Sequence, residues 1–481
     1  MSNKIDNLEP KEVFHWFHEI SQVPRGSGNE KAISDFLVDF AKQRNLEVYQ
    51  DHVLNVIIKK PGTTGYENSK PVIVQGHMDM VCEKTANSNH DFLKDPIELV
   101  VKGDELWANN TTLGADDGVA VAYALALLDA NDIPHPPVEV VITTSEETGM
   151  DGALGLTNDH LDSSIVINID SEEEGIFLVS CAGGANVSAE FDIKREALKN
   201  SVLEISVDGL TGGHSGIEII KQRANAIKVL GRLLNSLNGN VDFNLVKISG
   251  GSKHNAIASS ASAFVAVSDS AKSESLINDL AEKIKTEYRT TDKGLNVKTS
   301  MSSANFSEMF TTECTMSIVD FLIMVPDSTQ RMSKDIEGLV ETSLNNGVLE
   351  EKDGKLEFTI SVRSSVKSVL DSLIENIKIM AKRAGGVAQH NSEYPAWEYV
   401  ADSRVREVAI KTWKELTGNE PEIAAIHAGL ECGIFNKIIP NMDAISFGPD
   451  MADVHTPREH VSIPSIKKMW EFFKAFLANL K

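Results

Sequence analysis

Short apolar runs of strand length alternate with helical patterns through the first 185 residues of the chain. PVIVQG, PPVEVVITT and SIVINID are apolar runs, and the helical segments EKAISDFLVDFAKQ and GVAVAYALALLDAN lie before and between them. A strand that is buried on both faces has such an unbroken apolar run, and parallel strands need long crossover connections, usually helices. The alternation therefore predicts an α/β layer with a mostly parallel sheet.

The pattern changes near residue 186. NVSAEFDIKR, SVLEISVDG and ASAFVAVSD alternate apolar with polar residues, as half-solvated antiparallel strands do, and GIEIIKQRANAIKVLGRLLNSL is expected to form one long amphipathic helix. A similar set of patterns recurs from LNVKTSMSS to VLDSLIENIKIMAKRAGG, and the α/β style returns after EYPAW. We therefore predict a discontinuous α/β domain (residues 1–185 and 398–481) interrupted by a smaller α+β domain (residues 186–397) with an internal duplication.

Charge and cysteine content exclude several classes of function. The chain of 481 residues has a formal net charge of -24, which disfavours nucleic acid or an anionic membrane as its main partner. Its four cysteines form no CxxC pair, so neither a disulfide framework nor a thiolate zinc site is expected, and a reducing, cytoplasmic setting fits best. The amino-terminal sequence lacks the apolar core of a signal peptide, and the longest apolar run, VAVAYALALL, is too short to span a bilayer.

Acidic and imidazole side chains follow the predicted strands of the α/β part. Loops converge beyond the carboxyl ends of the strands in an open α/β sheet, and ligands bind there. The side chains that should meet at this edge are His77 and Asp79 after PVIVQ, Glu146 and Glu147 after VEVVITTS, Asp170 after SIVINI, His455 after AISFG, and Asp116 before the buried helix.

Neighbouring residues on an extended segment alternate in direction. His77 and Asp79 are therefore expected to lean the same way, so that the carboxylate can fix the imidazole ring. By the same rule, Glu146 and Glu147 are expected to point to opposite sides and to have different roles.

Each of these residues also has an ordinary interpretation. Asp116 could cap the helix that follows it, the Glu146–Glu147 pair could lie in a solvated loop, Asp170 could open the acidic turn SEEEG, and His455 could be a surface histidine. Carboxylates crowded at one sheet edge repel one another, however, unless a cation lies among them. Oxygen and imidazole ligands without thiolate suit zinc, manganese or cobalt. A bridging carboxylate with two histidines and two more carboxylates would hold two ions about 3.5–4 Å apart.

Several motifs resemble a known enzyme family. HMD (77–79), GADDG (114–118), SEETG (145–149), Asp170 and the late His455 resemble the co-catalytic zinc peptidase family of carboxypeptidase G, aminoacylase and carnosinase. Within that family, HAGLECG (427–433), TLGADDG, VSCAGG and YPAW are similar to the bacterial aminoacyl-histidine dipeptidases, and the similarity covers essentially the whole chain.

The resemblance implies a role for each of these residues. His77, Asp116 and Asp170 would bind one metal ion, and Asp116, Glu147 and His455 would bind the other. Asp79 would orient His77, Glu146 would be the general base, and the Asp116–Asp117 peptide would be cis.

The resemblance also makes the inserted domain a lid over the substrate. His214 in GGHSG would polarise the scissile carbonyl, and Asn255 in KHNAIA would lie near the substrate, although Ala258 stands where the family usually has proline. Arg363 is expected to grip the substrate carboxylate with its bidentate fork, and His427 in HAGLECG is expected to contact the substrate.

The sequence thus predicts a cytoplasmic dinuclear metal dipeptidase that hydrolyses dipeptides, including Xaa-His dipeptides of the carnosine type. Its cofactors would be two divalent ions, zinc in the first place, with manganese and cobalt as alternatives. A related deacylase of N-acyl amino acids would share every metal ligand. A metal-binding protein that has lost catalysis is a third interpretation, against which the intact Glu146 argues. The sequence leaves open whether the chain forms a homodimer.

Overall fold

The computed structural model describes residues 4–481, and its contacts divide the chain into two compact units. Of the described residues, the first unit contains 4–180, 399–425 and 430–481, and the second contains 181–398 and 426–429. The short segment Ile426–Gly429 thus belongs to the second unit although its neighbours in sequence belong to the first.

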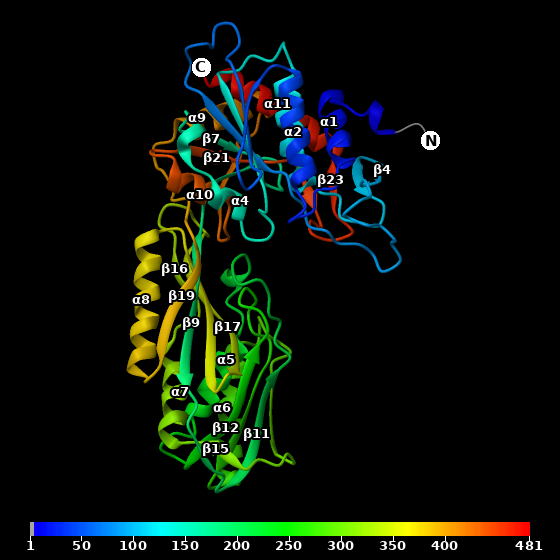
Figure 1. Cartoon of the computed structure of the whole chain (residues 1–481). Helices are drawn as coiled ribbons and strands as arrows, with labels where there is room; N and C mark the ends of the chain where they lie inside the picture. Colours follow the sequence, from blue (N-terminus) through cyan, green and yellow to red (C-terminus); the bar gives the residue numbers. More distant parts are fainter. Residues whose placement is uncertain (1–3) are drawn as a thin grey trace. The chain divides into compact units, whose positions relative to one another are not determined.

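The first unit has a central sheet covered by helices (Figure 1). Its helices are α1 (Lys11–Ser21), α2 (Lys31–Gln43), α3 (Ala115–Asp129), α4 (Asp151–Gly155), α9 (Arg404–Thr417), α10 (Glu431–Ile438) and α11 (Ile463–Asn479), with 3-10 turns η1 (Lys4–Asn7) and η2 (Asn158–His160). Its strands are β1 (Glu47–Gln50), β2 (Val56–Lys60), β3 (Val72–His77), β4 (Leu99–Lys102), β5 (Glu105–Ala108), β6 (Val138–Thr143), β7 (Ile165–Asn168), β8 (Ile176–Cys181), β20 (Glu422–Ile426), β21 (Asp443–Ser446), β22 (Met451–Ala452) and β23 (His460–Ser462).

Among the described residues the main sheet of this unit has the strand order β1-β2-β6-β3-β7-β21-β8-β20. The four strands at its centre, β6, β3, β7 and β21, pair in parallel, whereas β1, β2 and β8 pair antiparallel. Every residue of β3 and β6 is buried, which explains why both strands are mainly apolar. The predicted mostly parallel sheet is confirmed.

Helix α3 is apolar on all sides and is buried along almost its whole length. It packs against β3 and α1, and its Tyr123 hydroxyl donates a 2.6 Å hydrogen bond to the carbonyl of Ile466 in α11. Aromatic residues of α1 and α11, among them Phe14, Trp470 and Phe473, belong to the same core. The amino end of α3, where Asp116 lies, is thus anchored to the centre of the unit.

The second unit is an antiparallel sheet with helices packed on it. Its strands are β9 (Gly183–Asp192), β10 (Arg195–Ala197), β11 (Ser201–Asp208), β12 (Phe243–Gly251), β13 (Ala261–Val267), β14 (Asn296–Met301), β15 (Glu308–Phe310), β16 (Ser328–Met332), β17 (Val340–Lys352), β18 (Lys355–Ser364) and β19 (Val387–Tyr394). Its helices are η3 (Ile219–Lys221), α5 (Ala226–Asn235), α6 (Ser270–Glu287), α7 (Thr312–Met324) and α8 (Lys367–Arg383), and α8 runs along β9 and β19 (Figure 1).

The second unit repeats one order of elements. The large sheet reads β14-β11-β13-β12-β17-β18-β9-β19, so that in each half two consecutive antiparallel strands lie at the centre of the sheet, the first strand of that half lies beside them and its last strand lies at the edge. In one half the chain order is β11-α5-β12-β13-α6-β14, and in the other it is β9-α7-β17-β18-α8-β19. The predicted α+β insertion is confirmed, and the matching order of its halves agrees with the expected duplication.

The long helix predicted over residues 216–237 is wrong in its first half. Only η3 and α5 are helical there, because Gln222 has a left-handed backbone (φ +49°) and Asn225 begins α5 as its cap, accepting a 3.0 Å bond from the backbone N–H of Ile227. Apolar spacing continued through the turn, so the break was not visible in the pattern. None of the helices within residues 4–481 has the length and apolar character needed to cross a membrane.

Candidate functional site

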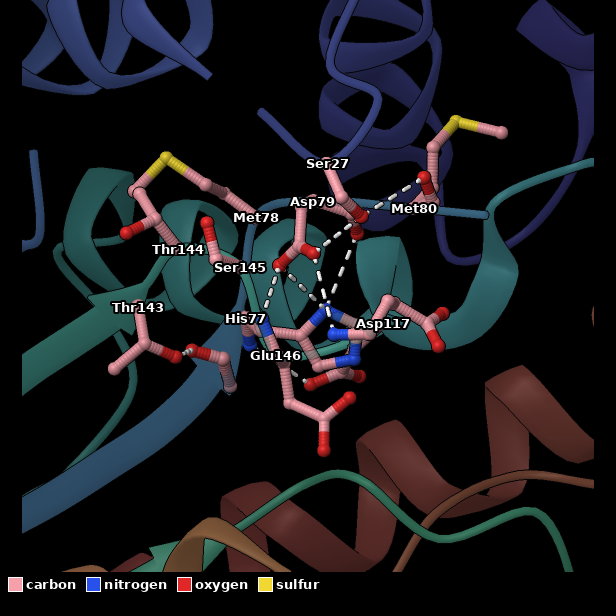
Figure 2. A network of polar contacts seen from close by, with 12 residues as sticks. Ser27, His77, Met78, Asp79, Met80, Asp117, Thr143, Thr144, Ser145 and Glu146 are labelled. Carbon is pink, nitrogen blue, oxygen red and sulfur yellow. Dashed lines mark hydrogen bonds and ion pairs between the residues drawn. The ribbon is translucent and has the colours of Figure 1, made fainter. Parts of the chain in front are cut away.

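His77 is the last residue of β3, and it is buried. Its Nδ1 lies 3.4 Å from Oδ1 and 3.1 Å from the backbone oxygen of Asp79, and its Nε2 lies 3.1 Å from Oδ1 of Asp116. Asp79 is held in turn by the hydroxyl of Ser27 at 2.7 Å and by the backbone N–H groups of Glu146 and Glu147 (Figure 2). The Asp79 carboxylate is therefore positioned to fix the orientation of the imidazole.

Asp116 lies where the chain turns into α3. Gly114 precedes this helix in a left-handed conformation, Asp116 and Asp117 depart from helical geometry, and the peptide between them is cis, as the resemblance implies. The Asp116 side chain reaches in two directions: Oδ1 lies 3.1 Å from Nε2 of His77, and Oδ2 lies 3.0 Å from Nε2 of His455. One carboxylate thus links two imidazoles.

Two further carboxylates complete the cluster. Oδ1 of Asp170, just after β7, lies 3.9 Å from Nε2 of His77, and Oε2 of Glu147 lies 3.0 Å from Nε2 of His455. The structure contains two groups of three residues whose ligand atoms, within each group, all lie within 4.8 Å of one another. The first group is His77, Asp116 and Asp170, and the second is Asp116, Glu147 and His455. The structure therefore brings together the five residues that the resemblance implies as metal ligands, with Asp116 shared.

The Glu146–Glu147 pair lies in a turn and not on an extended segment. Backbone N–H groups of Gly149 and Met150 donate to the carbonyl of Glu146, and Ser145 has a positive φ of 54°. Strand alternation is thus the wrong reason for expecting the two side chains to differ. They differ nevertheless, because Oε2 of Glu147 contacts His455 while Glu146 lies half-buried beside it.

The cluster carries strong mutual electrostatic effects. Burial raises the pKa of Asp170 well above its ordinary range, and it raises the pKa of Glu146 to about 8 against the opposing effect of His77. Hydrogen bonds to two carboxylates raise the pKa of His455 to about 11. Burial lowers the pKa of His77, but its hydrogen bonds to carboxylates outweigh this and raise it overall. Without a cation, the cluster is neutralised by protons.

The donor set suits divalent metal ions. It consists of carboxylate oxygens and imidazole nitrogens without thiolate, which is the ligand preference of zinc, manganese and cobalt. Oε1 of Glu147 is buried and has no hydrogen-bond partner among residues 4–481. A buried carboxylate oxygen without a partner is costly, and a cation at this position would satisfy it.

Comparison with known families agrees with this geometry. The sequence model of Peptidase family M20/M25/M40 matches residues 73–479. The chain belongs to this family. The predicted family and the predicted hydrolase class are thereby confirmed, and dinuclear metal binding is typical of M20 peptidases.

Two relatives match the M20 chain over its full length. It is 36% identical to the cytosol non-specific dipeptidase of Escherichia coli over 99% of both chains. The crystal structure of aminoacylhistidine dipeptidase from Vibrio alginolyticus is also 36% identical, with a TM-score of 0.93 over 99% of this chain and 98% of that one. Aminopeptidase PepT of Bacillus cereus, at 15% identity and a TM-score of 0.57 over 98% and 99% of the two chains, shares the fold.

The four residues predicted to contact substrate lie in the second unit. Nδ1 of His214 accepts hydrogen bonds from the backbone N–H groups of Gly216 and Ile217, at 3.2 Å each. In the neutral ring the proton therefore lies on Nε2. The backbone carbonyl of Asn255 accepts a 2.9 Å bond from Ser215, so the GGHSG and KHNAIA segments are adjacent.

Arg363 and His427 lie in one region of this unit. Arg363 pairs across the sheet with Ser343, whose hydroxyl lies 2.7 Å from Nε2 of His427. Nη1 of Arg363 donates a 2.6 Å bond to the hydroxyl of Tyr394. Burial and then the Arg363 charge lower the pKa of His427 to about 3, and the same two causes lower the pKa of His214. Both histidines are therefore neutral near pH 7.

Sequence reasoning missed several buried charged residues around the cluster. Glu431, at the start of α10, accepts hydrogen bonds from Gln75 at 2.5 Å and Thr143 at 2.6 Å, and burial raises its pKa to about 8. Arg25 and Glu459 contact the segments that carry the predicted ligands. Glu431 stands inside HAGLECG, which was a usable signal, but Arg25 and Glu459 belong to no pattern of spacing.

Proposed function

We propose that the chain is a metal-dependent dipeptidase that hydrolyses dipeptides, including Xaa-His dipeptides of the carnosine type, with Glu146 as its general base. The observation that carries the proposal is the pair of three-residue groups that share Asp116, with the half-buried Glu146 carboxyl near them. The names of the two full-length relatives, a non-specific dipeptidase and an aminoacylhistidine dipeptidase, support the substrate class.

The proposed ligands of one ion are His77, Asp116 and Asp170, and those of the other are Asp116, Glu147 and His455. Zinc is the first candidate, and manganese and cobalt suit the same donors. When bound, two such ions lower the pKa of an attacking water and polarise the peptide carbonyl.

Glu146 is proposed to take the proton of the attacking water and to deliver it to the leaving amine. Burial raises its pKa to about 8 in the ion-free chain, and two nearby cations would bring that pKa down again. The side chain would then be a carboxylate near pH 7 and could act as a base.

The second unit is proposed to bind the substrate. Arg363 would grip the substrate carboxylate, and Asn255 and His427 would contact the rest of the dipeptide. His214 would stabilise the oxyanion through Nε2–H, which its two backbone donors on Nδ1 leave as the protonated nitrogen.

A cytoplasmic setting is proposed from the name of the Escherichia coli relative. The net charge of -24 argues against nucleic acid as a partner. Light scattering at several protein concentrations distinguishes a monomer from a homodimer.

The proposal is tested with a panel of dipeptides, tripeptides and N-acyl amino acids, with and without chelator and with added zinc, manganese or cobalt. We expect chelation to abolish dipeptide hydrolysis and the ions to restore it, with Xaa-His dipeptides among the substrates. Unchanged hydrolysis after metal removal, verified by elemental analysis, would contradict the dinuclear mechanism. Preferential hydrolysis of N-acyl amino acids would instead identify the alternative deacylase.

His214→Ala is expected to lower kcat by about 10²–10³, the loss typical of one oxyanion donor. The matched control is His390→Ala, which removes an exposed histidine of the same unit from β19 and should leave kcat unchanged. Both variants are measured at saturating dipeptide. A change of less than about threefold for His214→Ala would mean that GGHSG forms only a turn.

A further inference from the structure

A buried carboxylate lies under the turn that carries Asp116. Glu459, at the start of the β23 region, is 2% exposed and accepts four consecutive backbone N–H groups. The donors are Leu113 at 2.7 Å, Gly114 at 3.0 Å, Ala115 at 2.7 Å and Asp116 at 3.4 Å. Successive N–H groups that converge on one anion form a rigid nest, so this single side chain defines the path of the turn.

The same turn is held from its other side by a buried arginine. Arg25 is 3% exposed, and its guanidinium donates to the carbonyls of Met78 at 3.0 Å, Asp79 at 3.3 Å and Gly114 at 2.5 Å. One planar group thus joins the segment that follows His77 at the end of β3, and that contains Asp79, to the turn before α3. A buried positive charge is tolerated here because Glu459 and Asp79 are among the carboxylates that face it.

The two glycines of GADDG leave room for this guanidinium. A methyl group built on Gly114 would lie 2.6 Å from Nη2 of Arg25, and one built on Gly118 would lie equally close to the same atom. Gly114 also needs its positive φ of 68°, which a side chain would oppose. The glycines on either side of Asp116–Asp117 are thus explained by Arg25, although they are 89 and 93 residues away from it in sequence.

We propose that Arg25 and Glu459 are positioning residues, which hold the Gly114–Asp116 turn so that the two oxygens of Asp116 face His77 and His455 at once. Neither residue contacts the reacting atoms. The inference rests on the proposed dinuclear centre and adds the two residues that position its shared carboxylate. Partners one step removed from a metal ligand typically contribute about 10–100-fold to metal affinity or activity.

Glu459→Gln is the test variant. It keeps the size of the side chain but replaces one acceptor oxygen by an NH₂ group, which cannot accept the backbone N–H groups of the turn. The matched control is Glu139→Gln. Glu139 is also 2% exposed, also accepts backbone N–H groups (those of Asp162 and Ser163), and lies at the opposite, amino end of β6. The measurements are zinc affinity by chelator competition, metal stoichiometry, kcat and KM, and Tm without metal.

We expect Glu459→Gln to weaken zinc binding by about 10–100-fold and to lower kcat with KM nearly unchanged, while Glu139→Gln keeps both values. The Tm without metal should fall by a similar amount in both variants. A loss of zinc affinity in Glu459→Gln alone then reports positioning and not a general loss of stability. Equal zinc affinity and kcat in the two variants would overturn the inference. If Glu459→Gln does not fold, Arg25→Lys replaces it, since lysine keeps the charge but cannot span three carbonyls. Failure of the wild-type protein to bind two ions would contradict the proposed function itself, and so the two failures are distinguishable.

Discussion

Replacing Asp116 by asparagine is expected to release both metal ions together and to bring dipeptide hydrolysis down to background. Its two carboxylate oxygens face His77 at 3.1 Å and His455 at 3.0 Å, and it is the one residue shared by the two candidate ligand groups. An amide is a neutral and weaker ligand, so neither ion keeps its bridging anion. Loss of several kcal/mol of transition-state stabilisation corresponds to a decrease in kcat of at least about 10³-fold.

The neighbouring Asp117 supplies the control. It is fully buried, burial raises its pKa above the ordinary range, and Asp117→Asn keeps the size of the side chain and one acceptor oxygen. The oxygen of the amide can still accept a backbone N–H, either that of His77 or that of Ala120. Asp117→Asn should retain two ions by elemental analysis. A finding that Asp116→Asn binds one ion tightly would show that the two sites do not share this carboxylate.

The α/β part of the fold was predictable because strands buried on both faces have mainly apolar sequences. β3, β6, β7 and β21 have a paired strand on each side, and most of their residues are apolar and buried. Prediction from apolar spacing fails for residues 216–237, because the helical spacing of apolar residues continues through a turn. The left-handed backbone of Gln222 and the cap of Asn225 impose the turn, and the spacing of apolar residues reports neither of them.

The candidate ligands were predictable for a related reason: each follows a strand or opens a helix at one sheet edge, and the topology brings those positions together. The roles of Arg25 and Glu459 could not be read in this way. Their partners are backbone groups, and a backbone group leaves no residue type in the sequence to recognise. Long-range side chain to backbone hydrogen bonds therefore become visible only once the fold is known.

The adjacent pair Glu146 and Glu147 offers the second large effect. Glu146→Gln keeps size and polarity but cannot accept the proton of the attacking water, so kcat should fall by about 10²–10⁴. Because Glu146 is not a proposed ligand, both ions should remain bound and Tm with metal should be unchanged. Glu147→Gln, in contrast, removes a carboxylate whose Oε2 lies 3.0 Å from His455. One ion should then bind more weakly, and activity should partly return at high zinc concentration.

Metal stoichiometry and kcat are therefore measured for both variants side by side, across a range of zinc concentrations. Since the two side chains are chemically identical and adjacent in sequence, differences between the variants report their positions in the cluster. Added metal separates the roles, because it can refill a weakened site but cannot replace a missing base. Loss of an ion in Glu146→Gln, together with an inactive Glu147→Gln that keeps two ions at every zinc concentration, would show that base and ligand are the reverse of the assignment made here.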